Sequence, residues 1–275
     1  MADHAAAGRL VVVDRSRPAF PVVMINRPDR RNALSASVVT ALKDAFAELR
    51  RDREASVIVL AGAGEGFCSG ADLSGEPDPA PDTADRGRVG LVYRSQEHLA
   101  ELVLAIHESE KPVIGAVHGA AVGGGLALAL ACDLRVATPS ARFGSVFIRV
   151  GLSSCDVGVS YFLPRIVGAT RAAELMLTGR HFSGEEADRF GMINTLAPEG
   201  GHIDAAVELA EQIARWTEYG IWMTKKGLWM NMDASSARHA IELENRTQVL
   251  GTFTGNMEEA AAAFRERRAP TWRPM

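Results

Sequence analysis

The run VIGAVHGAAVGGGLALALACDLRVA at residues 113–137 contains no charged side chain before Asp133. Its length is close to that of a membrane-spanning helix. However, it is rich in Gly and Ala, contains His118 and is interrupted by Asp133 and Arg135. We therefore interpret it as a buried strand–turn–helix–strand unit of an α/β protein, and expect neither a membrane span nor a membrane partner.

Three consecutive glycines, Gly123 to Gly125, lie inside this run, directly before a string of Leu and Ala. Glycine inside a helix or strand costs about 0.5–1 kcal/mol relative to alanine. Either the backbone packs closely at this place, or its amide groups bind a ligand.

Strand and helix patterns alternate along the first 200 residues, which indicates an α/β fold with a mostly parallel sheet. We predict strands within 9–28, 56–62, 112–119 and 133–139. We predict helices at 35–52 (behind a Ser N-cap), at about 90–110 and after the glycines. Residues 74–88 are predicted to form a mobile acidic loop. Beyond residue 200 the patterns are helical, at 203–217, 222–232 and 256–268. We expect an α/β core over 1–200 and a helical region over 201–275.

The composition excludes several classes of protein. A net charge of −4 and a pI of about 6.0 give no basic field for nucleic acid. Three scattered cysteines suit neither a disulfide framework nor a zinc site, and we expect no metal. The N-terminus shows no secretory signal pattern. We expect a cytoplasmic protein.

Glycines at two strand ends, in 66–73 and 118–129, suggest a site for negative charge. Free N–H groups at a helix N-terminus attract anions, with help from the helix dipole. Two converging amides would hold a developing oxyanion, whereas tight packing alone would also explain the glycines. A phosphate-binding loop is disfavoured because no Lys-Ser/Thr pair follows.

Several ordered motifs together resemble one family. They are INRPDRRNALS (25–35), VIVLAGAGEGFCSGADL (57–73), the 113–137 run, ARFG (141–144), LPRIVGATRAAELMLTGRHFSGEEADRFGMIN (163–194) and MEEAAAAFRERRAP (257–270). The chain resembles the crotonase (enoyl-CoA hydratase/isomerase) superfamily over almost its whole length. The resemblance implies a ββα spiral core with a C-terminal helical trimerisation region, and a homotrimer or dimer of trimers.

The resemblance also implies an acyl-CoA thioester substrate, with coenzyme A as part of the substrate and no separate cofactor. The oxyanion donors would be the N–H groups of Ala71 and Gly124. Such preorganised donors are each worth about 10²–10³ in rate. Further coenzyme A contacts are implied at Arg30, Arg31, Asn32 and, in a neighbouring subunit, Phe264; a solvated turn and a solvated helix end are the alternatives.

Two positions depart from the hydratases of this family. The glutamate of the GGGxE pattern is Ala127 here, and that of the FGxPE pattern is Phe147. Hydration needs one group to activate water and one to protonate carbon, and neither side chain exchanges a proton. We therefore expect ordinary enoyl-CoA hydratase activity to be weak or absent.

Asp156 is the candidate that could replace the missing acids. Its DVG context resembles that of dienoyl-CoA isomerases and of a dehalogenase in the family. One additional residue after Gly151 leaves open whether Asp156 or Cys155 occupies the equivalent place. Asp156 could act as base or nucleophile, or could cap the following helix.

Other polar residues have simpler interpretations. We expect Cys68 and Cys132 in the core, Cys155 as a buried inert thiol rather than a thiolate, and Asp72 as an N-cap. His118 is expected to be structural. Glu97, His98 and Glu101 either flank the pocket or form a solvated helix face. The sequence thus predicts isomerase-, hydrolase- or dehalogenase-like chemistry; the alternative is a catalytically silent acyl-CoA-binding or assembly protein.

Overall fold

The computed structural model describes residues 8–75 and 78–275. Among these residues, six strands form the main sheet in the order β1-β2-β3-β4-β6-β9. β1 and β2 pair in antiparallel fashion, and every later neighbour pairs in parallel. The strands are β1 (Val11–Asp14), β2 (Val22–Ile25), β3 (Ile58–Gly62), β4 (Val113–Val117), β6 (Leu134–Ala137) and β9 (Thr195–Leu196). This confirms the predicted α/β fold with a mostly parallel sheet.

A second sheet lies beside the first. Within the described chain it contains β5 (Ala120–Val122), β7 (Arg142–Gly144) and β8 (Phe182–Ser183). β4 leads into β5 and β6 leads towards β7, so each successive pair of strands contributes one strand to each sheet. An isolated bridge between Cys68 and Ala121 joins the turn after β3 to the second sheet. The chain therefore winds as a spiral of ββ units.

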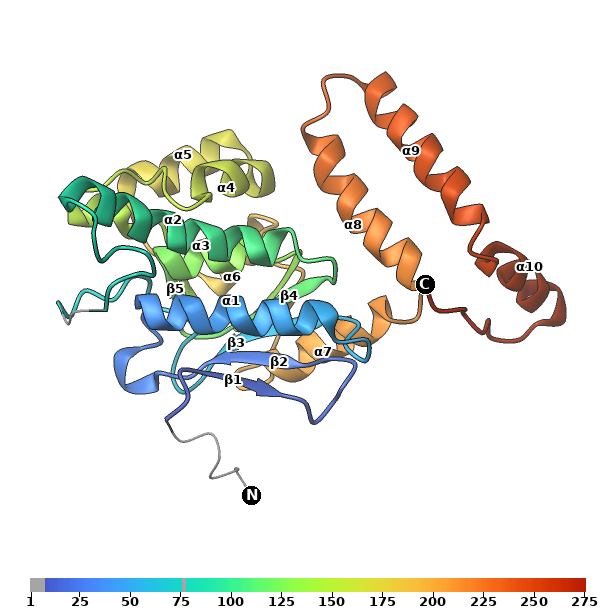
Figure 1. Ribbon diagram of the computed structural model, residues 1–275, viewed down its shortest axis with the longest axis horizontal. Coiled ribbons are helices and arrows are strands. Elements are labelled where there is room, and N and C mark those ends of the chain that lie inside the picture. The colour runs from blue at the N-terminus through green and yellow to red at the C-terminus, as the bar shows by residue number, and fades with distance from the viewer. Residues whose placement is uncertain (1–7, 76–77) are drawn as a thin grey trace.

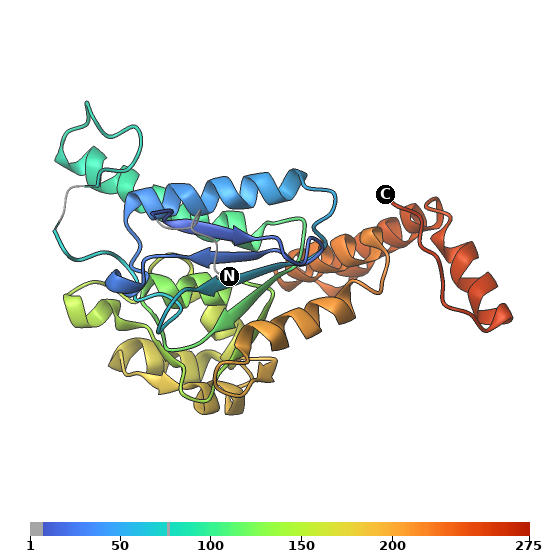
Figure 2. The same cartoon turned by 90° about the horizontal axis from the view of Figure 1, so that it is seen from below.

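Helices cover both faces of the main sheet. The helices are α1 (Ala36–Arg51), α2 (Arg88–His107), α3 (Gly124–Ala131), α4 (Val159–Val167), α5 (Ala169–Thr178), α6 (Gly184–Arg189), α7 (His202–Ile213), α8 (Glu218–Met232), α9 (Ala237–Thr252) and α10 (Asn256–Glu266), with 3-10 helices η2 (Pro28–Arg30) and η3 (Val146–Val150). In β3, Ile58 and Leu60 pack into the core under α1, whereas Val59 and Ala61 pack against α7. Figure 2 shows α1 and α7 on opposite sides of the sheet. A strand covered on both faces is apolar throughout.

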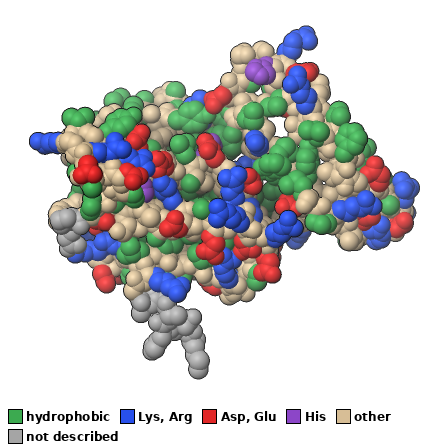
Figure 3. Space-filling view, in the orientation of Figure 1, with side chains coloured by type: hydrophobic (Ala, Val, Ile, Leu, Met, Phe, Trp, Pro, Cys, Tyr) green, Lys and Arg blue, Asp and Glu red, His purple; other side chains and the backbone are tan. Residues whose placement is uncertain are grey.

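The helices after residue 200 divide into two groups. α7 packs on the sheet through Ala206, Val207 and Ala210 and is thus part of the core, although the predicted boundary lies before it. α8 and α9 form a hairpin that projects from the core and carries α10 at its far end (Figure 1). Hydrophobic side chains are exposed along this hairpin (Figure 3), including Phe253, which is 82% exposed.

The expected loop before α2 has no helix or strand at 74–75 and 78–87, and residues 76–77 lie outside the described chain. Within the described residues, no helix combines the length and the apolar character needed to cross a bilayer.

Candidate functional site

The first candidate donor, the Ala71 amide, lies in a short parallel bridge with Leu34. Leu34 donates its N–H to the Gly70 carbonyl (2.8 Å) and accepts from the Asp72 N–H (3.0 Å). In a parallel bridge these two bonds flank the opposing residue, whose own N–H points the other way. The Ala71 N–H is therefore directed away from Leu34.

The second candidate donor, the Gly124 amide, begins α3. The N–H groups of a first helical turn have no acceptor within the helix, and the helix dipole makes this end attractive to negative charge. The preceding Gly123 has a φ of 56° and donates its N–H to the Gly144 carbonyl (2.9 Å). Gly124 is buried, and its amide lies at the N-terminal end of the helix.

The fold brings the two amides together. A Cβ placed on Gly124 would lie 3.9 Å from the Ala71 nitrogen, and a Cβ placed on Gly70 would lie 3.2 Å from the Gly124 nitrogen. Two N–H groups that lie this close suit one oxygen that carries negative charge.

Ala127 and Phe147, where the resemblance leads us to expect glutamates, are not ionisable, and both are buried. Ala127 follows Gly124 on α3 and has no exposed surface. Phe147 is 8% exposed, and its Cε1 lies 3.9 Å from the place of a Cβ on Gly123. An aromatic ring thus packs against the glycine turn of the site.

Asp156 lies between η3 and α4 and is half-buried. Its Oδ1 accepts hydrogen bonds from Gln96 Nε2 on α2 and from the Val157 N–H (2.8 Å). α4 has Gly158 as its N-cap residue and no side-chain cap bond, so Asp156 does not cap that helix. Cys155 beside it is exposed, contrary to the expectation of a buried thiol.

A cavity of about 580 Å³ adjoins Ala71 and runs between the start of α1 and α2. It combines apolar and polar side chains, including Leu34, Ser37, Asp78, Leu91, Val92, Gln96, His98 and Leu99. Concave pockets with an apolar lining and a few polar groups are the usual sites for small ligands. This cavity is the candidate acyl site.

His98 forms the most buried polar part of the cavity wall. Its Nε2 lies 3.0 Å from Thr40 Oγ1 and its Nδ1 lies 3.4 Å from Lys43 Nζ. Burial lowers the pKa of the imidazole, which favours its neutral form. Hydrogen bonds from Arg94 and Lys43 lower the pKa of Glu101 to about 2. The contacts of His98 and Glu101 fix α2 to α1, whereas Glu97 is exposed, as expected for a solvated helix face.

Two aspartates near Ala71 have structural partners. Asp72 pairs with Arg27 (2.9 Å), and hydrogen bonds from Ser74 and Arg27 lower its pKa. No helix begins after Asp72, so the expected N-cap role is wrong. Asp78 accepts from the Ser37 N–H (2.9 Å) at the start of α1, where the Ser35 side chain makes no cap bond. Sequence reasoning missed the Asp78 contact because the partners are far apart in the chain.

The turn after β2 carries the expected coenzyme A contacts. Arg30 and Arg31 are exposed. The Asn32 side chain is fully buried; it accepts from the Arg27 N–H (2.9 Å) and donates to the Ala63 and Gly66 carbonyls (2.8 and 2.7 Å). The structure gives this side chain the role of joining two turns.

The remaining candidates have structural surroundings or are exposed. Cys68 and Cys132 are buried as predicted, and burial raises the pKa of each thiol to about 12. His118 has a structural contact, 2.8 Å from its Nε2 to the Gly64 carbonyl oxygen, and its ring stacks on His202. Phe264 on α10 is 86% exposed.

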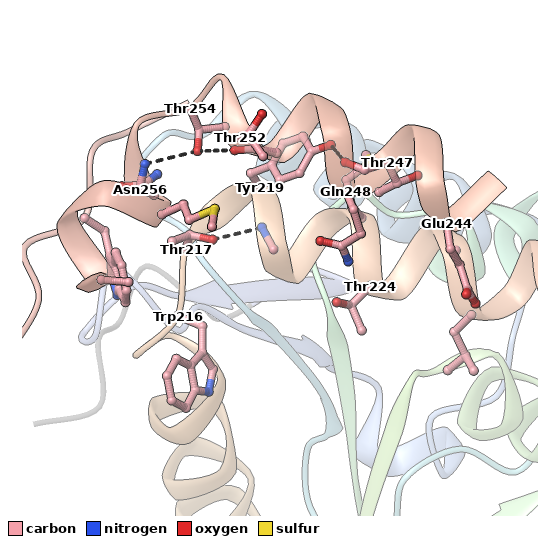
Figure 4. Close-up of a pocket in the computed structure, with 18 of the residues that line it drawn as sticks. Trp216, Thr217, Tyr219, Thr224, Glu244, Thr247, Gln248, Thr252, Thr254 and Asn256 are labelled. Carbon is pink, nitrogen blue, oxygen red and sulfur yellow. Dashed lines mark hydrogen bonds between the residues drawn. The ribbon is translucent and has the colours of Figure 1, made fainter. Parts of the chain in front are cut away.

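A larger cavity, of about 670 Å³, lies among α8, α9 and α10. Figure 4 shows its lining, where Tyr219 donates to the Thr247 carbonyl (2.6 Å) and the Gly220 N–H donates to Thr217 (3.0 Å). Its side chains belong to the projecting helices, and neither Ala71 nor Gly124 lines it. Size alone therefore does not identify the site.

Comparisons with known proteins found related sequences and structures. The sequence profile described as enoyl-CoA hydratase/isomerase matches residues 18–274. A probable enoyl-CoA hydratase of Mycobacterium bovis is 40% identical over 273 residues, covering 99% of this chain and 95% of the relative. A 1,2-epoxyphenylacetyl-CoA isomerase of Escherichia coli is 32% identical, covering 90% and 92%. The crystal structure of a probable enoyl-CoA hydratase/isomerase from Mycobacterium abscessus superposes with a TM-score of 0.91 at 38% identity, covering 96% and 99%.

Proposed function

This chain belongs to the enoyl-CoA hydratase/isomerase family, and on that premise we propose that Ala71 and Gly124 form the oxyanion hole for its acyl-CoA thioester. Chemistry next to a thioester places negative charge on the carbonyl oxygen. The proximity of the two amides, 3.9 Å between a Cβ on Gly124 and the Ala71 nitrogen, carries this proposal. Fixed donors stabilise such charge without reorganisation during the reaction.

The chemistry at the acyl carbons is non-standard, with Asp156 as the acting carboxylate. Ala127 and Phe147 offer no acid or base, so the pair of groups that hydration requires is absent from those positions. One carboxylate is sufficient to remove a proton from carbon and return it to another carbon, or to attack as a nucleophile. This supports isomerase-, hydrolase- or dehalogenase-like activity on an enoyl-CoA-like substrate.

Binding of coenzyme A is assigned to exposed groups. Arg30 and Arg31 lie on the turn beside the Ala71 loop and suit phosphate groups. Phe264 on α10 suits contact with the coenzyme A of a neighbouring subunit in a homotrimer or dimer of trimers. Coenzyme A arrives as part of the substrate, and the reaction scheme includes no separate cofactor.

Turnover of enoyl-, dienoyl- and aryl-CoA esters by the wild type and by Asp156→Ala tests the proposal. We expect turnover of at least one ester, abolished in Asp156→Ala, and little hydration of crotonyl-CoA. Robust crotonyl-CoA hydration that survives in Asp156→Ala would contradict the assignment.

The second candidate function is a silent acyl-CoA-binding or assembly protein, which the apolar Ala127 and Phe147 positions favour. Saturable binding of CoA esters without turnover of any of them would support it over the enzyme.

A further inference from the structure

A single hydrogen bond links Asp156 to the helix that forms one wall of the candidate acyl cavity. Gln96 on α2 donates from Nε2 to Asp156 Oδ1. The N–H of Val157 donates to the same oxygen (2.8 Å), and the Asp156 carbonyl accepts from the Val159 N–H (2.8 Å). The carboxylate is thus held between α2 and the segment that leads into α4.

Gln96 is attached to a well-anchored part of α2. Two residues further along, His98 is 3% exposed and contacts α1 through Thr40. One turn later, Glu101 accepts from Lys43 (2.5 Å) on α1. Gln96 itself lines the cavity that Ala71 also lines. The Gln96 amide therefore extends from a part of α2 that is anchored to α1 at the candidate site.

The Gln96 amide is a hydrogen-bond donor to the Asp156 carboxylate. A glutamine N–H donates, does not titrate, and therefore stabilises a carboxylate more than a carboxylic acid. The Gln96 amide and the Val157 N–H both donate to Oδ1 of Asp156. Among the described residues, no group donates a hydrogen bond to Oδ2, so it is the oxygen left to accept a proton.

We propose that Gln96 is a positioning residue, which fixes Oδ1 of Asp156 and presents Oδ2 for proton transfer. This inference deepens the proposed function and depends on it for the role of Asp156. In the step concerned, Oδ2 takes a proton from an acyl carbon. The C–H electron pair passes into an enolate, whose oxygen the Ala71 and Gly124 amides bind.

The titratable groups adjacent to this contact are Glu97 and Cys155. Glu97 lies 3.6 Å from Arg94 and is exposed, and the Cys155 thiol is exposed on the loop. Among the described residues, neither forms a hydrogen bond with Asp156, so changes at Gln96 act on a carboxylate whose side-chain donor is Gln96.

The test follows the titration of Asp156 by ¹³C NMR on protein labelled at the aspartate carboxyls, with Asp156→Asn to assign the signal. We expect Gln96→Ala to raise the Asp156 pKa by about half a unit to one unit, because a donor to the charged form is lost. Gln96→Glu should raise it further, because a like charge is added. Gln212→Glu places the same new charge on exposed α7 and should leave the titration unchanged.

An Asp156 pKa that stays within about 0.2 unit of wild type in both Gln96 variants would overturn the proposal. On an ester that the wild type turns over, Gln96→Ala should lower kcat at least about tenfold with KM nearly constant, and should move the acid limb of the pH profile upward with the NMR shift. A loss of kcat without that movement would also overturn it.

Absence of turnover in the wild type would contradict the proposed function, whereas the NMR comparison judges the Gln96 contact by itself. Circular dichroism of each variant at neutral pH verifies that the fold is intact; Gln96 is exposed, so folding should be retained.

Discussion

Each of the three consecutive glycines meets a different physical requirement. Gly123 has a φ of 56°, in the left-handed region that favours glycine. Gly124 supplies the amide at the tip of α3. A Cβ on Gly125 would lie 2.1 Å from the Cys68 carbonyl oxygen, so that helix and strand could not approach as they do. Close packing and an available amide, the two explanations raised by the sequence, both apply to this turn.

Gly124→Pro tests the amide as an oxyanion donor. Proline is well tolerated at the first position of a helix, where its missing N–H has no acceptor within the helix. The change removes the donor at the candidate site, so we expect kcat on a turned-over CoA ester to fall by about 10²–10³. Steady-state kinetics, with circular dichroism to verify folding, make the measurement.

Ala169→Pro is the matched control, since Ala169 is exposed and begins α5. Its kinetics should resemble those of the wild type. Equal activity of Gly124→Pro and wild type would show that this amide does not stabilise the reaction.

His202 predicts a dependence of stability on pH. It is 8% exposed, lies against His118, and has neither ring nitrogen hydrogen-bonded among the described residues. Burial, with the charge of His118, lowers its pKa from 6.5 to about 4. The unfolded chain therefore binds a proton at this histidine more readily than the folded protein does. The contribution of His202 to the free energy of unfolding is full above pH 6.5 and falls as the pH drops towards 4, by up to about 3 kcal/mol.

Urea unfolding at pH 7.5 and pH 4.5 measures this loss. His202→Phe should reduce the difference between the two conditions, whereas the change of exposed His239 to Gln should preserve it. An unchanged difference in His202→Phe would assign the acid sensitivity to other groups.

At the scale of elements, the C-terminal end of α3 is fixed by buried polar contacts. The Arg135 guanidinium is buried and donates to the Cys132 and Met192 carbonyls (2.7 and 2.6 Å) at the end of α3. Asp133 beside it pairs with Lys225 of α8 (2.7 Å), with side chains 14% and 8% exposed. The helix that supplies the candidate oxyanion donor is thus joined to the projecting hairpin.

Lys225→Met should destabilise the protein by about 3–5 kcal/mol, because it leaves a shielded carboxylate without its cation. Denaturant unfolding measures the change. The neighbouring Lys226 is exposed and lies over the Trp222 ring (5.5 Å), so Lys226→Met should cost less than about 1 kcal/mol. Similar effects of the two changes would show that the Asp133 pair does not attach α8.

The sequence predicted those elements whose residues carry their own pattern. β3 is apolar on both faces, and α1 buries Val38, Leu42 and Leu49 at helical spacing. The short strands β5, β7 and β8 were not predicted, because two or three residues acquire strand geometry only from a distant partner. α9 was also not predicted. At the site, the sequence indicated the two amides, but not Gln96, whose contact with Asp156 spans 60 positions.

At the scale of the whole molecule, the projecting hairpin predicts self-association. Large apolar side chains on it are exposed, among them Val249, Leu250, Phe253 and Met257. Exposed apolar surface of this kind marks interaction sites. We expect light scattering to give a mass three or six times 29.4 kDa, and Phe253→Glu with Leu250→Glu to lower it. A monomeric wild type would refute this prediction.

The complete burial of Ala127 also limits which substitutions this position can accept. A glutamate introduced there would enter a helix whose eight residues are all buried, and Phe147 would remain packed against the glycine turn. An unpaired carboxylate in such surroundings is costly. Ala127→Glu alone should therefore not create hydratase activity, because the new side chain needs volume that the buried helix does not offer.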